Sequence, residues 1–560
     1  MYFFLALGIV MGDYDITMIE GVGMAIVHQH DKRSGITYAY ESISHWDKEK
    51  KQSRAKRTLI GRVDDITGEI VPTRGTNRPT KEIIMNKTAK RGPVPSTETS
   101  RKFFGATYLL DVLGQRLGLV SDLKQCFPQS YKQIISLAYY LILEADSPLS
   151  RFSKWSSLHQ HPYGKDIPSQ RSSEIFSSIT EEDRYRFFRL QAARRAELEY
   201  WAYDITSVSS YSECLKQIRY GYNKEQDHLA QLNLALVFGQ ESSLPFYYRK
   251  LPGNVTDVKT VRNMLADMDF LNLKKVHLVM DRGFYSTDNI NELYKGHHKF
   301  LIGAKLSLKL VKEQLDSVRH SLREWSNYCE SHEVFALCVP VTWDYAQKRP
   351  YKGDTIRGGR RMYLHLYFNS ERAAEDEQRL TRRLLALQKE LQGGVMKPEN
   401  ARLYDKYFEI HETPTRGIKV IARQEAIDEA RKNYGYFALI SNEVKDPVKA
   451  LDIYRNKDLV EKAFGNLKER LSMRRLLVSS EQSLDGKLFV QFVALIYISC
   501  IKQAMQKNNL FGTYTLQGLL DQLDVIECFG RPGKNLRVGE ITKKQQELYT
   551  TLGVDPPSSL

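Results

Sequence analysis

Four side chains that could act together in chemistry recur at helical spacing between positions 454 and 468. Tyr454, Lys457, Glu461 and Lys468 lie in a stretch without proline whose apolar residues also follow a helical period. At about 100° per residue, the four fall within roughly 60° of one another on a helical wheel. Such a face would let the carboxylate hold a metal ion while the lysines bind phosphate oxygens. The simpler alternative is a solvated helix face with an (i, i+4) Lys–Glu pair.

Two aspartates stand near the ends of β-prone runs in the middle of the chain. Asp204 follows a run of aromatic and small residues that begins at position 200, and Asp281 follows an apolar run. Further elements are predicted around them, with strands at 229–238, 244–250 and 300–304 and helices at 258–268 and after 284. This order predicts an α/β sheet in which the first and fourth strands lie side by side, with Glu461 above them. Either aspartate alone could instead be an ordinary turn or helix-capping residue.

Three carboxylates gathered in one place repel one another unless divalent cations lie among them. Two Mg²⁺ ions roughly 3.5–4 Å apart would activate a water or a 3′-hydroxyl and stabilise the leaving oxygen of a phosphodiester displacement, and Mn²⁺ could substitute. Asp204, Asp281 and Glu461 are therefore predicted as catalytic residues and as metal ligands. The reaction class is phosphoryl transfer on a nucleic-acid backbone.

Charge and composition indicate the same class of partner. The chain has 560 residues, a formal net charge of +15 and a pI near 9.2. This excess of positive charge attracts polyanions, and nucleic acid fits better than a small acidic substrate. The six cysteines form no CxxC pair, which argues against a disulfide framework or a zinc ribbon and fits a reducing cytoplasm. The apolar run Leu488–Ile501 is shorter than a membrane span needs, so no membrane partner is expected.

Changes in composition and periodicity divide the chain into eight segments. Their predicted order is an over-extended start at 1–23, a small β-rich basic region at 24–72, a linker at 73–100, a helical DNA-end-binding region at 101–199, the first part of the catalytic core at 200–305, an insertion domain at 306–435, the second part of the core at 436–501, and a C-terminal region at 502–560 that is a candidate for dimerisation. The insertion is expected to fold as a largely β domain of its own, because it is far longer than a loop.

Two basic clusters are candidates for contact with DNA. The first lies in the predicted N-terminal hairpin and contains Lys50, Lys51, Arg54, Lys56 and Arg57. The second, formed by Arg474 and Arg475, continues the basic face that begins at Lys457. Each cation that neutralises a phosphate releases counterions, and this release favours binding. The first cluster could equally be a solvated surface hairpin.

The quoted residues resemble those of the DDE transposases of bacterial insertion sequences. The subgroup concerned has a Tyr-x2-Arg-x3-Glu-x6-Lys signature and a large insertion before its catalytic Glu. Tyr454, Lys457, Glu461 and Lys468 occupy the signature positions, and Asp204 and Asp281 resemble the first and second acids. The similarity extends from Met24 to about Ile501. One position departs, because Lys457 replaces the Arg of the signature and so keeps the charge but loses the bidentate fork.

The resemblance implies an RNase H-like catalytic core with a mixed sheet, interrupted by the insertion and preceded by the small β region and the helical DNA-binding region. It also implies Mg²⁺ dependence, cleavage of double-stranded DNA at terminal inverted repeats, and strand transfer to target DNA within a synaptic homodimer. Tyr454 would position the DNA end, while Lys457 and Lys468 would hold its phosphates. The expected location is the nucleoid in a bacterial cytoplasm. Two alternatives stay open: an RNase H-like nuclease that does not join DNA, and a DNA-binding copy that no longer cuts.

Overall fold

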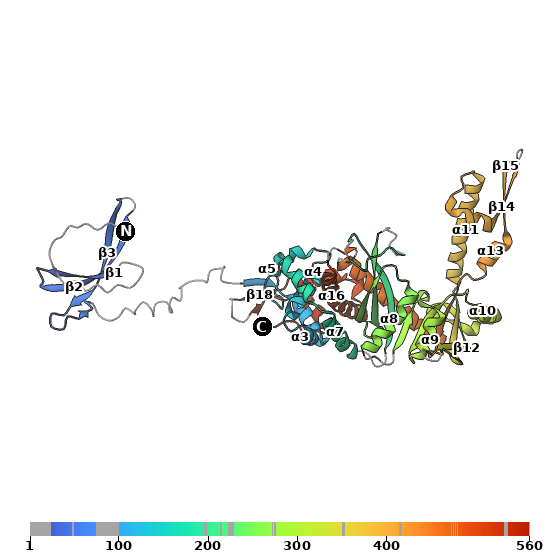
Figure 1. Cartoon of the computed structure of the whole chain (residues 1–560), viewed down its shortest axis with the longest axis horizontal. Coiled ribbons are helices and arrows are strands. Elements are labelled where there is room, and N and C mark those ends of the chain that lie inside the picture. Colours follow the sequence, from blue (N-terminus) through green and yellow to red (C-terminus); the bar gives the residue numbers. More distant parts are fainter. Residues whose placement is uncertain are drawn as a thin grey trace. The chain divides into compact units, whose positions relative to one another are not determined.

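The computed structural model divides into two compact units, residues 1–95 and 96–560 (Figure 1). The residues that the structure describes are 24–47, 50–73, 100–194, 199–212, 215–221, 229–271, 273, 276–349, 353–413, 417–471, 473, 475–476, 478, 480–530 and 536–558. The expected over-extended start at 1–23 and nearly all of the expected linker lie outside these residues.

The first unit is a four-stranded antiparallel sheet with strands in sequential order. Its strands are β1 (Met24–Asp31), β2 (Ile36–Asp47), β3 (Gln52–Val63) and β4 (Ile70–Val71). The basic cluster lies in this hairpin: Lys50 and Lys51 lie in the turn between β2 and β3, and the other three cations lie on β3, all of them exposed. Exposed cations on an edge of a thin sheet fit both the DNA-contact hypothesis and the solvated-hairpin alternative.

A large mixed sheet forms the centre of the second unit. Among the described residues it has ten strands, ordered β11-β12-β13-β16-β10-β9-β6-β7-β8 with β17 paired to β6. Their bounds are Tyr328–Cys329 (β11), Val334–Lys348 (β12), Thr355–Phe368 (β13), Tyr436–Ser441 (β16), Lys299–Ala304 (β10), His277–Met280 (β9), Tyr200–Ser210 (β6), Gln231–Gly239 (β7), Pro245–Pro252 (β8) and Arg475–Leu476 (β17). The mixed α/β class expected from the sequence is confirmed.

The pairing of β6 with β9 decides where the two aspartates lie. The strands β6, β7 and β8 form an antiparallel meander, while β9 runs parallel to β6 and β10 runs parallel to β9. Tyr203 of β6 is level with Met280 of β9. Asp204 and Asp281 each follow these residues by one position, so they lie at the same level on neighbouring strands. The expectation that the first and fourth strands are adjacent is confirmed.

Helices cover both faces of the sheet. On one face, α14 (Pro447–Arg455) packs over β9, β10, β12 and β13, and its Leu451 belongs to a buried cluster with Leu439. On the other face, α10 (Lys309–Leu322) packs on β12 and β13 within the main core. The connections around β9 are helical, with α8 (Asp257–Phe270) before it and α9 (Thr287–Lys295) after it.

The insertion differs from the largely β, separate domain that the sequence predicted. Strand β12 pairs along the whole of β13, and the second half of β13 pairs with β16, so both strands extend the central sheet. The physical reason lies in β13, whose first seven residues are exposed and whose last seven are buried and mostly apolar. The remainder is α11 (Ser370–Gln392), α12 (Ala401–Tyr407), α13 (Gln424–Arg431) and the small sheet of β14 (Phe408–Thr413) and β15 (Gly417–Ala422).

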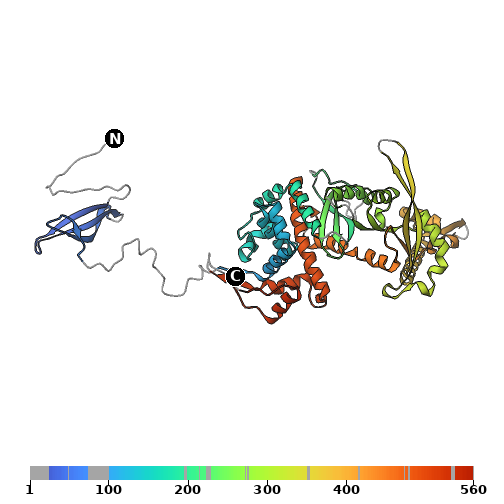
Figure 2. The same ribbon diagram turned by 90° about the horizontal axis from the view of Figure 1, so that it is seen from below.

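The helical region before the sheet packs around one long helix. Its helices are α2 (Gly105–Arg116), α3 (Leu119–Cys126), α4 (Tyr131–Leu143), α5 (Phe152–Leu158), α6 (Ser169–Ser178) and α7 (Glu181–Ala193). The long helix α16 (Glu481–Lys507) contacts α4, α6 and β8, and Figure 2 shows it between the helical region and the sheet. At 27 residues it is longer than the predicted Leu488–Ile501, because Ser480 caps it about two turns earlier in the chain and the helix continues to Lys507.

Length and composition alone would allow α16 to cross a membrane, and among the described residues it is the single helix that passes this test. However, 83% of its most apolar window is buried inside the protein. Buried residues occur all around the helix, as in the core helix of a globular domain.

The C-terminal region packs against the start of the helical region of its own chain. It contains α17 (Leu516–Asp524), β18 (Glu527–Gly530), β19 (Arg537–Val538) and α18 (Lys543–Thr551). Strand β18 pairs with β5 (Ser100–Phe103), and the Tyr549 hydroxyl donates a hydrogen bond to the Gly105 carbonyl at 2.8 Å. The described part of 502–560 therefore completes the helical region.

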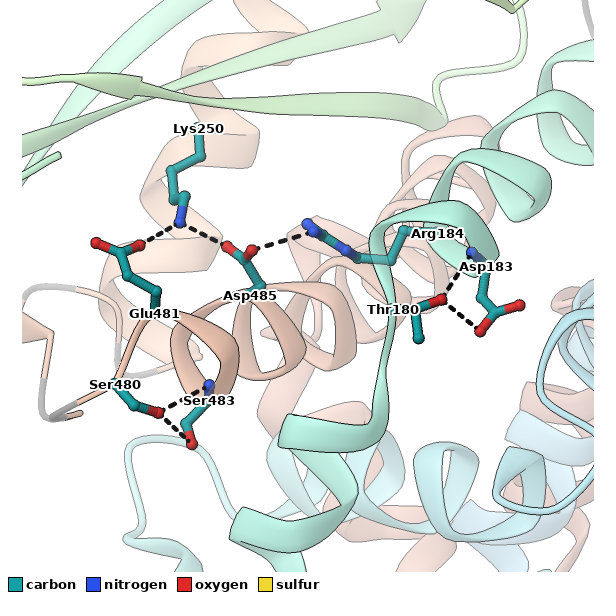
Figure 3. A network of polar contacts seen from close by, with 8 residues as sticks. All are labelled: Thr180, Asp183, Arg184, Lys250, Ser480, Glu481, Ser483 and Asp485. Atoms are coloured by element: carbon teal, nitrogen blue, oxygen red, sulfur yellow. Dashed lines mark hydrogen bonds and ion pairs between the residues drawn. The ribbon is translucent and has the colours of Figure 1, made fainter. Parts of the chain in front are cut away.

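An ionic network ties the helical region to the sheet through α16 (Figure 3). Lys250 at the end of β8 lies 2.6 Å from Glu481 and 2.7 Å from Asp485, both on α16, and Arg184 of α7 lies 3.1 Å from Asp485. The Lys250 and Arg184 side chains are each only 12% exposed. Charges this poorly solvated need their partners, so the network fixes α7, β8 and α16 relative to one another.

Replacing Asp485 should destabilise this junction. Asp485→Asn removes the negative charge that Lys250 and Arg184 share, and leaving buried cations underpaired is expected to cost about 3 kcal/mol of unfolding free energy. Urea denaturation followed by circular dichroism measures the change. The matched control is Asp376→Asn, which breaks the pair with Arg379, whose side chain is 69% exposed, and is expected to cost under about 1 kcal/mol. Equal midpoints for both variants would show that the network does not stabilise the fold.

Candidate active site

A hydrogen bond joins the helix that carries the predicted signature to the end of a central strand. The Tyr454 hydroxyl donates to Asp281 Oδ1 at 2.6 Å, across 173 positions of sequence. Tyr454 lies in the last turn of α14, and Asp281 directly follows β9. Burial and the neighbouring carboxylate raise the pKa of the Tyr454 phenol well above its ordinary value, so the phenol stays a proton donor.

The environment keeps Asp281 ionised. Burial by itself raises the pKa of this carboxyl, but the hydrogen bonds from Tyr454 and the Arg282 backbone, together with the cations of Lys457 and Arg282, lower the pKa below its ordinary value. Asp281 is therefore an anion throughout the physiological pH range. Asp204, level with it on β6, accepts a hydrogen bond from the Ile205 backbone N–H at 2.7 Å.

The predicted continuous helix from Tyr454 to Lys468 is interrupted in the structure. The helix α14 ends at Arg455, a turn follows, α15 spans Asp458–Gly465, and Asn466–Arg470 form one π-helical turn, η7. A π turn changes the hydrogen-bond spacing and therefore the direction of the side chains beyond it. Tyr454, Lys457 and Glu461 still lie on one side of this segment. The position that the helical wheel predicted for the Lys468 side chain does not apply, because Lys468 belongs to the π-helical turn.

Lys457 lies among the three predicted acids. Its Nζ donates to Glu461 Oε1 at 3.0 Å, and the charges of Asp281, Glu461 and Asp204 all raise the pKa of Lys457 against the opposing effect of burial. The Lys457 side chain is 16% exposed and that of Glu461 is 59% exposed. The (i, i+4) pair of the simpler alternative thus exists, but it lies beside Asp281 and Asp204 rather than on an isolated surface. Asp281 directly follows β9 as predicted, whereas Asp204 lies within β6 and not at a strand end, because β6 continues to Ser210.

The three acids do not form a closed set of metal ligands in this structure. Among the described residues, no three His, Cys, Asp or Glu side chains lie close enough together to hold one ion. The ammonium of Lys457 instead supplies the positive charge that the carboxylates require. An ammonium in this place shows that the site accepts a cation, and carboxylate oxygens are the donors that hard divalent cations prefer.

Gly303, which was not predicted from the sequence, makes room for the Tyr454 contact. It lies on β10, next to β9. A Cβ atom at this position would lie 2.8 Å from the Tyr454 hydroxyl oxygen and 2.9 Å from the Arg282 backbone nitrogen. Only glycine therefore lets the Tyr454 ring approach Asp281 so closely. No sequence signal marks Gly303, because it lies in an apolar strand far from both partners.

The remaining predicted residues belong to other parts of the chain. Lys468 lies in η7, half-buried. Arg475 begins β17, whose pairing with β6 brings the backbone of Arg475 level with Ser209, and Arg474 lies outside the described residues. The cluster of Lys50, Lys51, Arg54, Lys56 and Arg57 belongs to the first unit.

A cleft of about 510 Å³ opens beside Asp281 and Tyr454. Its lining includes the cations Arg282, Lys305 and Arg372, which the sequence analysis did not single out. Arg282 could have been found, since it follows Asp281 directly. Arg372 could not, because its place at the cleft depends on the way the insertion joins the sheet.

Comparison with known proteins gives one family. The family model described as "Transposase DDE domain" matches residues 201–497. Among solved structures, a cryo-EM structure of a piggyBac transposase synaptic complex with hairpin DNA matches at 9% sequence identity, covering 70% of this chain and 70% of that chain with a TM-score of 0.35. No curated protein sequence matches the chain.

A methyl group at position 303 should disturb the Tyr454–Asp281 contact. Gly303→Ala is expected to cost about 1–3 kcal/mol of unfolding free energy, because the new Cβ overlaps the Tyr454 hydroxyl and the Arg282 backbone. Adding Tyr454→Phe removes the hydroxyl and should recover part of this loss. Thermal and urea unfolding of the two single variants and the double variant measure the coupling. Strictly additive losses would show that the hydroxyl does not fill the space above Gly303.

Proposed function

The chain belongs to the Transposase DDE domain family, and on this premise we propose that it cuts and joins DNA at the terminal inverted repeats of a bacterial insertion sequence. The observation that carries the proposal is the hydrogen bond from Tyr454 to Asp281. It docks the helix before Glu461 onto the strand end that holds the second acid. This contact supports the assignment of the signature segment and the second acid to one site.

The order of the sheet supports an RNase H-like core. A meander of three antiparallel strands is followed by two strands parallel to the first, with helices between them. This arrangement places Asp204 near the middle of the sheet and Asp281 at the adjacent strand end. Glu461 belongs to α15, which packs on β6 and β7.

Asp204, Asp281 and Glu461 would hold the divalent cations, which we propose to be two Mg²⁺ ions replaceable by Mn²⁺. When bound, these ions supply Lewis-acid activation of the attacking oxygen and charge stabilisation of the leaving oxygen. The residues fit this task because Asp281 is kept anionic and because Lys457 already shows that the site accepts positive charge.

The chain's own residues would then position the DNA. Tyr454 holds Asp281 in place through its hydroxyl and lines the cleft in which a strand end can lie. Lys457 keeps its proton, because neighbouring carboxylates raise its pKa, and so remains available as a phosphate ligand. Lys468 and the basic cluster on β3 would bind phosphates farther along the duplex. Two copies would pair the two ends of the element before joining them to target DNA at the bacterial nucleoid.

Loss of one acid should abolish the chemistry but not DNA binding. With a supercoiled plasmid that carries the ends flanking this gene, and with Mg²⁺ or Mn²⁺, the parent protein should cut and join those ends. Glu461→Gln should lower both rates by at least about 10³-fold, because the amide cannot replace a carboxylate ligand. Product analysis on gels measures cutting and joining separately.

The control for Glu461→Gln is Asp458→Asn, an exposed acid in the first turn of the same helix. It should retain activity. Cutting without joining in the parent would favour the nuclease alternative, and binding without cutting would indicate an inactive copy. Activity that persists in Glu461→Gln would show that Glu461 is not catalytic.

Lys457 should compete with divalent cations when DNA is absent. Lys457→Met removes a positive charge next to the three acids, and Mn²⁺ affinity is expected to rise about tenfold or more, given the strength of charge interactions at this range. Calorimetric titration of the free protein with Mn²⁺ measures the effect independently of activity. Lys457→Arg keeps the charge and should change little. The control is Lys462→Met on the same helix, and equal affinities for Lys457→Met and this control would contradict the expectation.

A further inference from the structure

The cleft beside Asp281 carries an excess of positive charge. Arg282, Lys305 and Arg372 line it, and Asp281 is the one acid in its lining. Among the described residues, none of these three cations forms an ion pair, although many other cations of the chain do. Three cations against one carboxylate in an open cleft favour an anionic ligand.

Arg372 reaches the cleft from the insertion. It is the third residue of α11, and its backbone N–H donates to the Asn369 side chain at 2.6 Å in the helix cap. The guanidinium lies over the Phe437 ring at 5.6 Å, and Phe437 stacks on Tyr367 at 4.7 Å with an interplanar angle of 10°. The stack holds the guanidinium plane while leaving its N–H edges open to a ligand.

The place of Arg372 in its helix argues for a binding role. A cation in the first turn of a helix opposes the positive end of the helix dipole, so this position is unfavourable for an arginine that has no other task. An anion beside the same turn would be attracted by both the guanidinium and the dipole. α11 has 23 residues, long enough for a full dipole.

The cleft continues into a second one of about 390 Å³. The two share Arg372, Phe437 and Tyr454, and the second adds Arg379 and Arg455 together with the acids Glu371 and Glu375. The excess of positive charge is therefore confined to the cleft beside Asp281. Because that cleft opens into a second one, it fits a phosphate within a longer chain better than it fits a single small anion.

We propose that Arg282, Lys305 and Arg372 bind a backbone phosphate of the DNA strand next to the bond that is cut, and that the insertion thereby contributes directly to holding the DNA end. This inference rests on the proposed function, because it places the phosphate relative to the acids of that site. Arg372 provides two parallel N–H donors to the phosphate, while Lys305, directly after β10, and Arg282, in the turn after β9, add charge.

The test combines a protein variant with a modified phosphate. Binding of a duplex that carries the terminal repeat is measured by fluorescence anisotropy at several salt concentrations, for the parent and for Arg372→Gln. The variant should bind about tenfold more weakly and lose about one unit of the salt slope. Neutral methylphosphonate links are placed singly at the cut bond and at its neighbours. One link should weaken the parent about tenfold and have no further effect on Arg372→Gln, because the same contact is removed twice.

The matched control is Arg379→Gln on the same helix, an exposed arginine paired with Asp376 that lines only the second cleft. Each methylphosphonate link should weaken duplex binding by Arg379→Gln by the same factor as it weakens binding by the parent. Deoxyadenosine monophosphate serves as a competitor, and if it bound the parent as tightly as the duplex and lost affinity with Arg372→Gln, the cleft would be a free-nucleotide site. If the losses of duplex affinity caused by Arg372→Gln and by each methylphosphonate link were additive at every position, the proposal would be overturned. A parent that binds no duplex at all would instead overturn the proposed function.

Discussion

The buried negative charge of Asp281 is the constraint on which the site depends. Asp204 and Asp281 lie at the same level on parallel strands, and Glu461 comes from a helix packed on that sheet. Without neighbouring cations and hydrogen-bond donors, burial would disfavour the Asp281 charge. The Lys457 ammonium and the Tyr454 hydroxyl meet this need, and both come from the segment that carries Glu461. The acids and the groups that stabilise them therefore arrive together.

The large sheet explains how an insertion can belong to an active site. Since β13 pairs with β16, its end and the start of α11 lie at the edge where β9 and β10 end. Arg372 is thereby delivered to the cleft beside Asp281. A separate domain on a flexible tether would not hold an arginine against a fixed aromatic stack. The extension of the sheet makes the insertion part of the same rigid support as the acids.

Much of the site could be predicted from local sequence. The apolar run before Asp281 and the β-prone run before Asp204 predicted the two strands, and their order predicted that they would be neighbours, as they are. Helical spacing predicted the Lys457–Glu461 contact as an (i, i+4) pair. The prediction of one straight helix was wrong at Lys468, because the π turn at Asn466–Arg470 depends on packing rather than on helix propensity.

Residue types and short periodic patterns were enough to predict the chemistry of the acids, the excess of positive charge and the strands that bear Asp204 and Asp281. The tertiary structure alone decided that Tyr454 bonds to Asp281, that Gly303 must lack a side chain, and that Arg372 faces the cleft. Each of these is a contact between residues far apart in the chain. Such contacts depend on sheet order and helix packing, which no local pattern encodes.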